Sequence, residues 1–197
     1  MRKAQQLLLH TCCADCAIKF LHEIGHSSIR KFKRTVQNNY SVTLYFDNSN
    51  IHPRSEYLAR QKDVKMIAEK YNLKLIIADW SPKLWFAAIG NRKTNKNLAR
   101  CRACWKLRLS RTAEKSRELG IPLFSTTLLT SHYQNQKIIS KIGKSLENND
   151  LHFLNIKKPG NILKTSGFYK QNYCGCVYSL IERYEQRKEL NTSTNSE

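Results

Sequence analysis

The sequence predicts an α/β fold in which helices cover both faces of a parallel sheet. Short apolar segments alternate with longer helical segments along the chain, and this alternation is typical of parallel sheets. The 197 residues are 41% hydrophobic and 25% charged, which suits one globular domain, predicted over 1–190. The tail, 191–197, is polar and is predicted to be disordered.

Five segments are predicted to be strands. Leu7-Leu8-Leu9 is continuously apolar, as a strand buried on both faces should be, and 42–46 is rich in β-branched and aromatic residues. The remaining predicted strands are 73–78, 122–127 and 151–156.

Helices are predicted between and after these strands. Pro53 suits the first position of a helix, and Gly120 suits the residue that closes one. The predicted helices are 14 to about 25, a basic segment 29–38, 55–71, a short helix opened by Ser81-Pro82, 101–119, 134–146 and 177–187. The predicted loops are 92–100 and 160–172.

Two polar motifs follow the first two predicted strands. Cys12-Cys13 comes just after the first strand, and 47–52 comes just after the second. Folds of this class bind ligands beyond the carboxyl ends of their strands. We therefore expect the two motifs to meet at one edge of the sheet.

The charge balance favours a polyanionic partner. Lys and Arg number 34 against 15 Asp and Glu, which gives a formal net charge of +19. Such a field attracts nucleic acid and speeds its capture. A solvated basic surface and an anionic membrane surface are the alternatives.

The chain lacks the apolar runs of membrane and secreted proteins. None reaches the roughly 18 residues of a membrane span, and Leu7-Leu8-Leu9 is too short for a signal peptide. The sequence therefore predicts a cytoplasmic protein with no membrane partner. Thiols stay reduced in the cytosol, so the seven cysteines are predicted to be metal ligands or redox groups.

Two pairs of cysteines have the character of metal ligands. Cys101 and Cys104 are three residues apart, which places them on one face of a helix. The adjacent Cys12 and Cys13 would point to opposite sides of a regular strand, so they need an irregular turn to share a site. Cys16 follows one helical turn later. The spacing fits both zinc and an iron–sulfur cluster, and ordinary buried thiols are the plain alternative.

Cys174-Gly175-Cys176 is a different kind of motif. A disulfide across one residue closes a very small ring, and strained disulfides tend to be labile or catalytic. Gly175 supplies the backbone freedom that such a ring needs. A redox-active dithiol is the favoured interpretation, with metal ligation and structural thiols as alternatives.

These motifs together resemble the epoxyqueuosine reductase QueH family. The likeness extends from about residue 7 to about residue 185. The matching segments are 8–14, 45–53 with Glu56-Tyr57, 100–104 with Arg108-Leu109, 124–129 with Ser131, 167–171 and 173–176. The resemblance implies a Rossmann-like sheet of the adenine nucleotide alpha-hydrolase (HUP) type.

The resemblance also implies an activity and its partners. The family reduces the epoxide of epoxyqueuosine to queuosine at the wobble position of tRNA, which is the last step of queuosine biosynthesis. The implied partners are the anticodon arm of tRNA and an electron donor that the sequence does not identify. The strongly basic stretch 92–117 would then guide the anticodon arm to the site. The competing interpretation is a zinc-stabilised RNA-binding module without redox activity.

The resemblance further implies the cofactors. A [4Fe-4S] cluster would be held by Cys12, Cys13, Cys101 and Cys104, with an additional metal, for which iron is the candidate, close by. The remaining pair, Cys174 and Cys176, would form the redox-active disulfide.

One position departs from the family. Asp15 stands where the family usually has proline, and an aspartate there is expected to cap the following helix. Its neighbour Cys16 occupies a position that is Cys or Asp in relatives. Both residue types bind iron, so Cys16 is a candidate ligand of the additional metal.

The turn after the second strand supplies the catalytic candidates, Asn50 and His52. Opening an epoxide leaves an alkoxide that must be protonated, and histidine is the usual proton donor near neutral pH. A solvated turn is the alternative for these residues. Three aromatic residues are candidates for base stacking or for the core: Trp85, Phe86 and Trp105.

Overall fold

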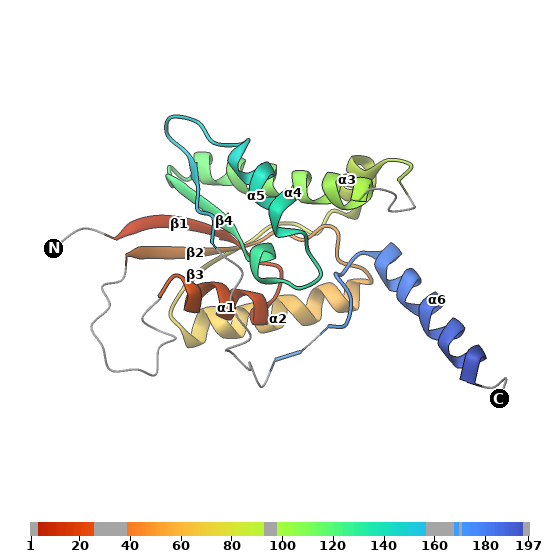
Figure 1. Cartoon of the computed structure of the whole chain (residues 1–197). Coiled ribbons are helices and arrows are strands. Elements are labelled where there is room, and N and C mark those ends of the chain that lie inside the picture. Colours follow the sequence, from red (N-terminus) through yellow and green to blue (C-terminus); the bar gives the residue numbers. More distant parts are fainter. Residues whose placement is uncertain (1–3, 26–38, 93–97, 157–167, 170, 195–197) are drawn as a thin grey trace.

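The structure, a computed structural model, describes residues 4–25, 39–92, 98–156, 168–169 and 171–194 (Figure 1). Its strands are β1 (Gln5–His10), β2 (Tyr40–Phe46), β3 (Lys74–Ile77), β4 (Leu123–Thr126) and β5 (His152–Phe153). Its helices are α1 (Ala14–Glu23), α2 (Arg54–Lys70), α3 (Pro82–Ile89), α4 (Ala99–Glu118), the short 3-10 helix η3 (Thr127–Thr130), α5 (Gln136–Lys144) and α6 (Val177–Thr194).

The five strands form one parallel sheet in the order β3-β2-β1-β4-β5. Helices α1 and α2 cover one face, and α4 and α5 cover the other, with α3 packed against α4 (Figure 1). Helix α6 extends away from the sheet. The predicted α/β class, with a parallel sheet between two layers of helices, is therefore confirmed.

Strand β1 is the centre of the sheet. Leu7, Leu8 and Leu9 are fully buried. Leu7 and Leu9 belong to the main core cluster, whereas Leu8 packs in a smaller cluster with Tyr45 and Ile121. Alternate residues of a strand point to opposite faces, so the continuous apolar run reflects burial on both sides.

Several predicted boundaries differ from the structure. Strand β5 contains two residues where 151–156 was expected, and α4 begins at Ala99, inside the predicted loop 92–100. Helix α6 includes 191–194, where the sequence predicts the start of a disordered tail. The predicted helix 29–38 and most of the loop 160–172 lie outside the described residues.

The carboxyl edge of the sheet positions the polar motifs. Cys12 follows β1, the turn from Asp47 follows β2, and η3 continues directly from β4. Since β1 lies between β2 and β4, the three connections are neighbours. The sequence predicts this for the connections after β1 and β2. Among the described helices, none has the length and apolar character needed to cross a membrane.

Candidate functional site

Three cysteines gather where β1 leads into α1. Cys12 and Cys13 follow β1, and Cys16 lies in the first turn of α1. All three are buried, and their sulfur atoms lie within 4.8 Å of one another. The turn directs the adjacent Cys12 and Cys13 to one point, with their sulfurs 3.9 Å apart. This cysteine triad has the geometry to hold a soft metal ion.

Neighbouring polar groups hydrogen-bond to the triad. The Thr127 hydroxyl accepts from the amide of Cys12 at 3.0 Å and donates to its sulfur at 3.2 Å. The Gln171 amide nitrogen donates to the sulfur of Cys13 at 3.5 Å. Such donors stabilise sulfur that carries negative charge and orient it toward a bound group.

The three thiols of the triad differ in acidity. Hydrogen bonds from Cys13 and Cys16 lower the pKa of Cys12 well below its usual value. The hydrogen bond with Cys12 raises the pKa of Cys13 to about 11, and that of Cys16 is raised well above its usual value for the same reason. Cys12 is therefore the most acidic thiol of the triad. A metal would displace the remaining thiol protons, because cysteine ligates as thiolate.

Arg108 is a buried cation close to the triad. Its Nη2 donates to Asn48 Oδ1 at 2.5 Å, and its Nε donates to His10 Nε2 at 3.3 Å. Burial and the charge of Arg108 lower the pKa of His10, so this imidazole is neutral and can accept. The same charge contributes to the low pKa of Cys12. Arg108 therefore offsets negative charge at the triad.

The other four cysteines border a small cavity. Cys101 and Cys104 lie at the start of α4, and Cys174 and Cys176 precede α6. The cavity measures about 20 Å³ and is lined by Asn50, Trp85, Arg100, Cys101, Cys104, Trp105, Arg108, Gln134, Cys174 and Cys176. The structure thus brings the C-x-x-C and C-x-C motifs together.

The C-x-C motif is arranged as a dithiol. The sulfurs of Cys174 and Cys176 are 3.8 Å apart, and the Ser179 hydroxyl lies 3.1 Å from Cys174 Sγ. The hydrogen bond from Cys176 lowers the pKa of Cys174 to about 6. The pKa of Cys176 is raised by its hydrogen bond to Cys174 and by burial. Cys174 is therefore a thiolate at neutral pH, which is the reactive form in disulfide exchange.

Cys101 and Cys104 are not members of the triad. Within the residues that the structure describes, the triad is the one group of His, Cys, Asp or Glu whose ligand atoms can meet at a single ion. Arg108 links the two groups, since it lines the small cavity and its charge acts on both Cys12 and Cys104. A cofactor held by Cys12 and Cys13 together with Cys101 and Cys104 would have to be larger than one ion. This ligand set stays a prediction.

Asn50 and His52 lie beside the C-x-C motif. Asn50 lines the small cavity. His52 Nδ1 is 2.8 Å from the carbonyl oxygen of Asn50, and the His52 amide donates to the Gly175 carbonyl at 2.8 Å. Burial lowers the pKa of His52. Asn50 Oδ1 and His52 Nε2 are buried without a hydrogen-bond partner among the described residues. Both atoms are therefore available to a bound group.

The aromatic candidates divide into two kinds. Trp85 is 0% exposed and Trp105 is 2% exposed, so they are core residues. Phe86 is 42% exposed and packs against His52, with ring centroids 5.3 Å apart. Only Phe86 of the three presents a ring to solvent.

A buried ion pair that the sequence did not reveal supports the C-x-C motif. Arg60 Nε donates to Glu56 at 2.6 Å, and the Tyr169 hydroxyl donates to the other oxygen of Glu56 at 2.7 Å. Arg60 Nη1 donates to the carbonyl of Cys174. The available signal was the i,i+4 spacing of Glu56 and Arg60 on one helix, which predicts an ion pair but not its burial.

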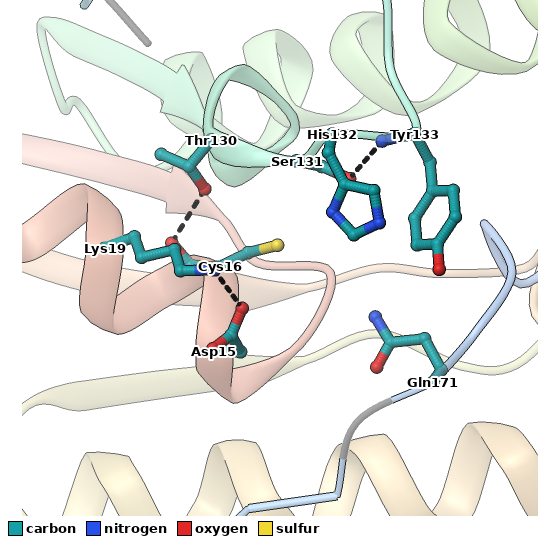
Figure 2. A pocket seen from close by; sticks show the side chains of 8 residues that line it. All are labelled: Asp15, Cys16, Lys19, Thr130, Ser131, His132, Tyr133 and Gln171. Carbon is teal, nitrogen blue, oxygen red and sulfur yellow. Dashed lines mark hydrogen bonds and ion pairs between the residues drawn. The ribbon is translucent and has the colours of Figure 1, made fainter. Parts of the chain in front are cut away.

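A pocket opens beside the triad (Figure 2). It measures about 240 Å³ and is lined by Asp15, Cys16, Lys19, Thr130, Ser131, His132, Tyr133 and Gln171. Figure 2 shows His132 and Tyr133 directed into the space that Cys16 and Gln171 face. The sequence singled out neither ring. Their position just beyond a strand, at the carboxyl edge, was the signal that could have indicated them.

Asp15 does not cap α1, contrary to the expectation from the sequence. The N-cap residue is Cys13, whose side chain makes no capping hydrogen bond. Asp15 lies in the first turn, where a negative charge suits the helix dipole. Its carboxylate accepts from the ammonium of Lys19 at 2.7 Å. The residue thus forms part of the rim of the pocket.

Comparison with known proteins identifies relatives of the chain. A family model described as epoxyqueuosine reductase QueH matches residues 7–182. The chain is similar to the epoxyqueuosine reductase QueH of Thermotoga maritima, with 34% identity over 93% of this chain and 95% of that protein. It is also similar to the protein of the same name from Acinetobacter baylyi, with 35% identity over 90% of this chain and 81% of that protein.

Proposed function

Because the chain belongs to the epoxyqueuosine reductase QueH family, we propose that its two cysteine groups work together to reduce epoxyqueuosine. It is an oxidoreductase that converts epoxyqueuosine to queuosine in tRNA. The observation that carries the proposal is the buried cysteine triad at the carboxyl edge of the sheet, with the Cys174/Cys176 pair in the small cavity that Arg108 also lines.

The cofactor that fits this site is a [4Fe-4S] cluster held by Cys12, Cys13, Cys101 and Cys104. Of these four thiols, Cys12, Cys13 and Cys104 are buried and Cys101 is half-buried. Hydrogen bonds from Thr127 and Gln171 to sulfur and the buried cation Arg108 suit an anionic iron–sulfur group. An additional iron ion would take Cys16 as a ligand. When bound, these groups would supply one-electron transfer and a Lewis acid for the epoxide oxygen.

The Cys174/Cys176 dithiol balances the reaction. Converting an epoxide to an alkene and water consumes two electrons and two protons. Oxidising the Cys174 thiolate and the Cys176 thiol to one disulfide releases two electrons and one proton, and the solvent supplies the second proton. The sulfurs lie 3.8 Å apart, so little movement is needed to join them. An external electron donor must then reduce the disulfide before the next turnover.

Asn50 and His52 are the proposed catalytic side chains beside the dithiol. The buried Asn50 Oδ1 and His52 Nε2 are without partners among the described residues, which supports a role in holding a bound group. Burial lowers the pKa of His52, and Nδ1 lies 2.8 Å from the Asn50 carbonyl oxygen, which can only accept a hydrogen bond. The proton of the neutral ring is therefore on Nδ1, and Nε2 is an acceptor. The proposed task of His52 is to take up a proton at Nε2 and deliver it to the oxygen released from the epoxide.

The remaining proposals concern the setting of the enzyme. The anticodon arm of tRNA is the proposed macromolecular partner, supported by the net charge of +19. The cytoplasm is the proposed compartment, and one domain over 1–190 is the proposed organisation. The HUP type is the proposed fold family, supported by the parallel strand order β3-β2-β1-β4-β5.

The test is anaerobic purification followed by iron and sulfide analysis and an assay on tRNA that contains epoxyqueuosine. We expect a brown protein with four irons and four sulfides per cluster, and nucleoside mass spectrometry should detect queuosine after addition of a reductant. A colourless, zinc-loaded protein that binds tRNA but forms no queuosine would support the RNA-binding zinc module instead.

A further inference from the structure

The pocket beside Cys16 is the cavity of the site that has room for a nucleobase. The small cavity between the C-x-x-C and C-x-C motifs measures about 20 Å³, which admits about one water molecule. The pocket of Figure 2 measures about 240 Å³ and reaches the triad through Cys16. Of these two cavities among the described residues, only the pocket of Figure 2 can therefore admit a base beside the cysteines.

A larger cavity elsewhere does not suit the reaction. It measures about 470 Å³ and includes Gln6, Ser41 and Lys74, which lie near the amino ends of β1, β2 and β3. Its lining contains no cysteine. The cysteines lie at the opposite, carboxyl edge of the parallel sheet, so this cavity is remote from them.

One wall of the pocket is a pair of aromatic rings. The ring centroids of His132 and Tyr133 are 3.8 Å apart. Tyr133 is 38% exposed, so its ring is accessible to a ligand. Unpaired bases stack on such rings, because every base has a flat π face.

The segment that carries these rings is anchored at both ends. The Tyr133 amide donates to the Ser131 hydroxyl at 3.3 Å, and Gln136 donates to the Ser131 carbonyl at 2.8 Å. The Thr130 hydroxyl donates to the Cys16 carbonyl at 3.0 Å, which joins the same segment to α1. The rings are therefore held at a set position relative to Cys16.

Polar groups line the remaining sides. Asp15 and Lys19 form an ion pair at 2.7 Å on α1. Gln171 contacts the sulfur of Cys13 and also lines the pocket. A ligand in this pocket would meet the aromatic rings on one side. On another side it would meet these hydrogen-bonding groups and the thiol of Cys16. This combination suits a flat base that carries a polar substituent.

We propose that this pocket receives the unpaired wobble nucleoside, with its base against the His132–Tyr133 rings and its epoxide-bearing substituent directed toward Cys16. The inference rests on the proposed function, since it assigns the place of its substrate. It adds His132 and Tyr133 as binding residues. An enzyme that acts on one nucleoside must take it out of its stack, and a receiving platform lowers the cost of doing so.

The test uses the anaerobic holoprotein and an epoxyqueuosine-containing anticodon stem-loop RNA with a fluorescent end label. With the Cys174/Cys176 dithiol oxidised beforehand and no reductant added, there is no turnover, so fluorescence anisotropy reports binding alone. Tyr133→Leu and His132→Ala should each weaken binding on the order of 10-fold, the loss typical of one stacking contact. Tyr133→Phe retains the ring and should bind like the unsubstituted protein. In the presence of reductant, the two damaging variants should raise KM more than they lower kcat.

Matched controls come from the opposite edge of the sheet. Tyr71 ends α2 and His152 begins β5, so Tyr71→Leu and His152→Ala change the same residue types away from the pocket. Both should leave binding unchanged. Iron content and circular dichroism of each variant exclude loss of the cluster or of the fold as the cause.

The outcomes separate this inference from the proposed function. If the unsubstituted protein forms queuosine while Tyr133→Leu and His132→Ala both bind within twofold of it, the pocket is not the nucleoside site and the function stands. If the stem-loop binds with the expected dependence on both rings but no queuosine forms, the pocket assignment stands and the proposed function fails.

Discussion

Arg60 Nη1 lies 3.4 Å from the carbonyl oxygen of Cys174 and donates a hydrogen bond to it. The guanidinium is 2% exposed and is paired with the buried Glu56. Its positive charge acts on Cys174 of the dithiol and on Cys13 of the triad, where it favours thiolate in both cases. One buried side chain thus connects the two cysteine groups electrostatically.

Replacing this charge should make Cys174 less acidic. The pKa of Cys174 is lowered to about 6, chiefly by the hydrogen bond from Cys176, with smaller contributions that include Arg60. Because the charge favours thiolate, Arg60→Gln should raise this pKa by about one unit or less. Alkylation of Cys174 by iodoacetamide, measured by peptide mass spectrometry over a pH series, slows as the pH is lowered through the pKa. In Arg60→Gln this slowing should occur at a higher pH than in the unsubstituted protein.

Arg60→Lys is the matched control, since it keeps the positive charge. The alkylation midpoint of Cys174 should then stay close to about 6. An unchanged midpoint in Arg60→Gln would show that the charge does not reach the dithiol.

The backbone of the C-x-C motif depends on its glycine. Gly175 has φ +114, and a Cβ there would lie 3.1 Å from Arg60 Nη1 and 3.2 Å from Ile51 Cγ1. Gly175→Ala should therefore combine backbone strain with crowding, and we expect it to lower the free energy of unfolding by about 1–3 kcal/mol. Urea denaturation of anaerobic protein measures this, and queuosine formation should fall as well.

Gly120→Ala separates the two causes. Gly120 also has a positive φ, +63, but nothing lies within 4 Å of the Cβ that would be added. Its substitution should cost backbone strain alone and leave queuosine formation intact. Equal losses of activity in the two variants would contradict a local effect at the dithiol.

Much of the fold follows from local patterns in the sequence. The apolar run at residues 7–9 and the β-branched segment 42–46 predict strands that the structure contains as parts of β1 and β2. The ends of these strands, combined with the rule that parallel strands carry their sites at the carboxyl edge, predict that Cys12 and the Asp47 turn meet. Hydrophobic periodicity and the topology rule for parallel sheets were therefore sufficient to predict the strands and the edge at which the site lies.

Contacts between segments that are far apart in the sequence could not be predicted from such patterns. Arg60 is an ordinary surface residue by type, and only the fold carries Cys174 to it, 114 positions later. Likewise, Tyr133 and Cys16 line one pocket because η3 packs beside α1. Cys16 was assigned apart from Cys12 and Cys13, yet the turn that starts α1 brings all three together. Tertiary packing, not spacing, decides these cases.

The dithiol should be needed for repeated turnover but not for cluster assembly. Cys174→Ser removes one sulfur of the pair, so the two electrons of disulfide formation are no longer available. We expect unchanged iron content and absorbance, with at most one queuosine formed per chain. Quench-flow sampling with excess tRNA and reductant measures this, and normal multiple turnover in Cys174→Ser would remove the dithiol from the mechanism.

The ligand set can be decided by comparing Cys16→Ala with Cys104→Ala. Both side chains are buried thiols of the same size, at 5% and 8% exposed, so the two substitutions disturb packing to a similar extent. If Cys104 holds the cluster, its loss should remove most of the iron and the sulfide, because a cluster needs its four cysteines. If Cys16 holds only the additional iron, its loss should leave the sulfide content unchanged and remove about one iron per chain.

Cys16→Asp extends the comparison. A carboxylate also binds iron, so this variant should keep the additional iron that Cys16→Ala loses. Loss of sulfide in Cys16→Ala, with sulfide retained in Cys104→Ala, would instead identify the buried triad of Cys12, Cys13 and Cys16 as cluster ligands. That result would agree with the 4.8 Å grouping of their sulfurs and would leave Cys104 as a lining residue of the dithiol cavity.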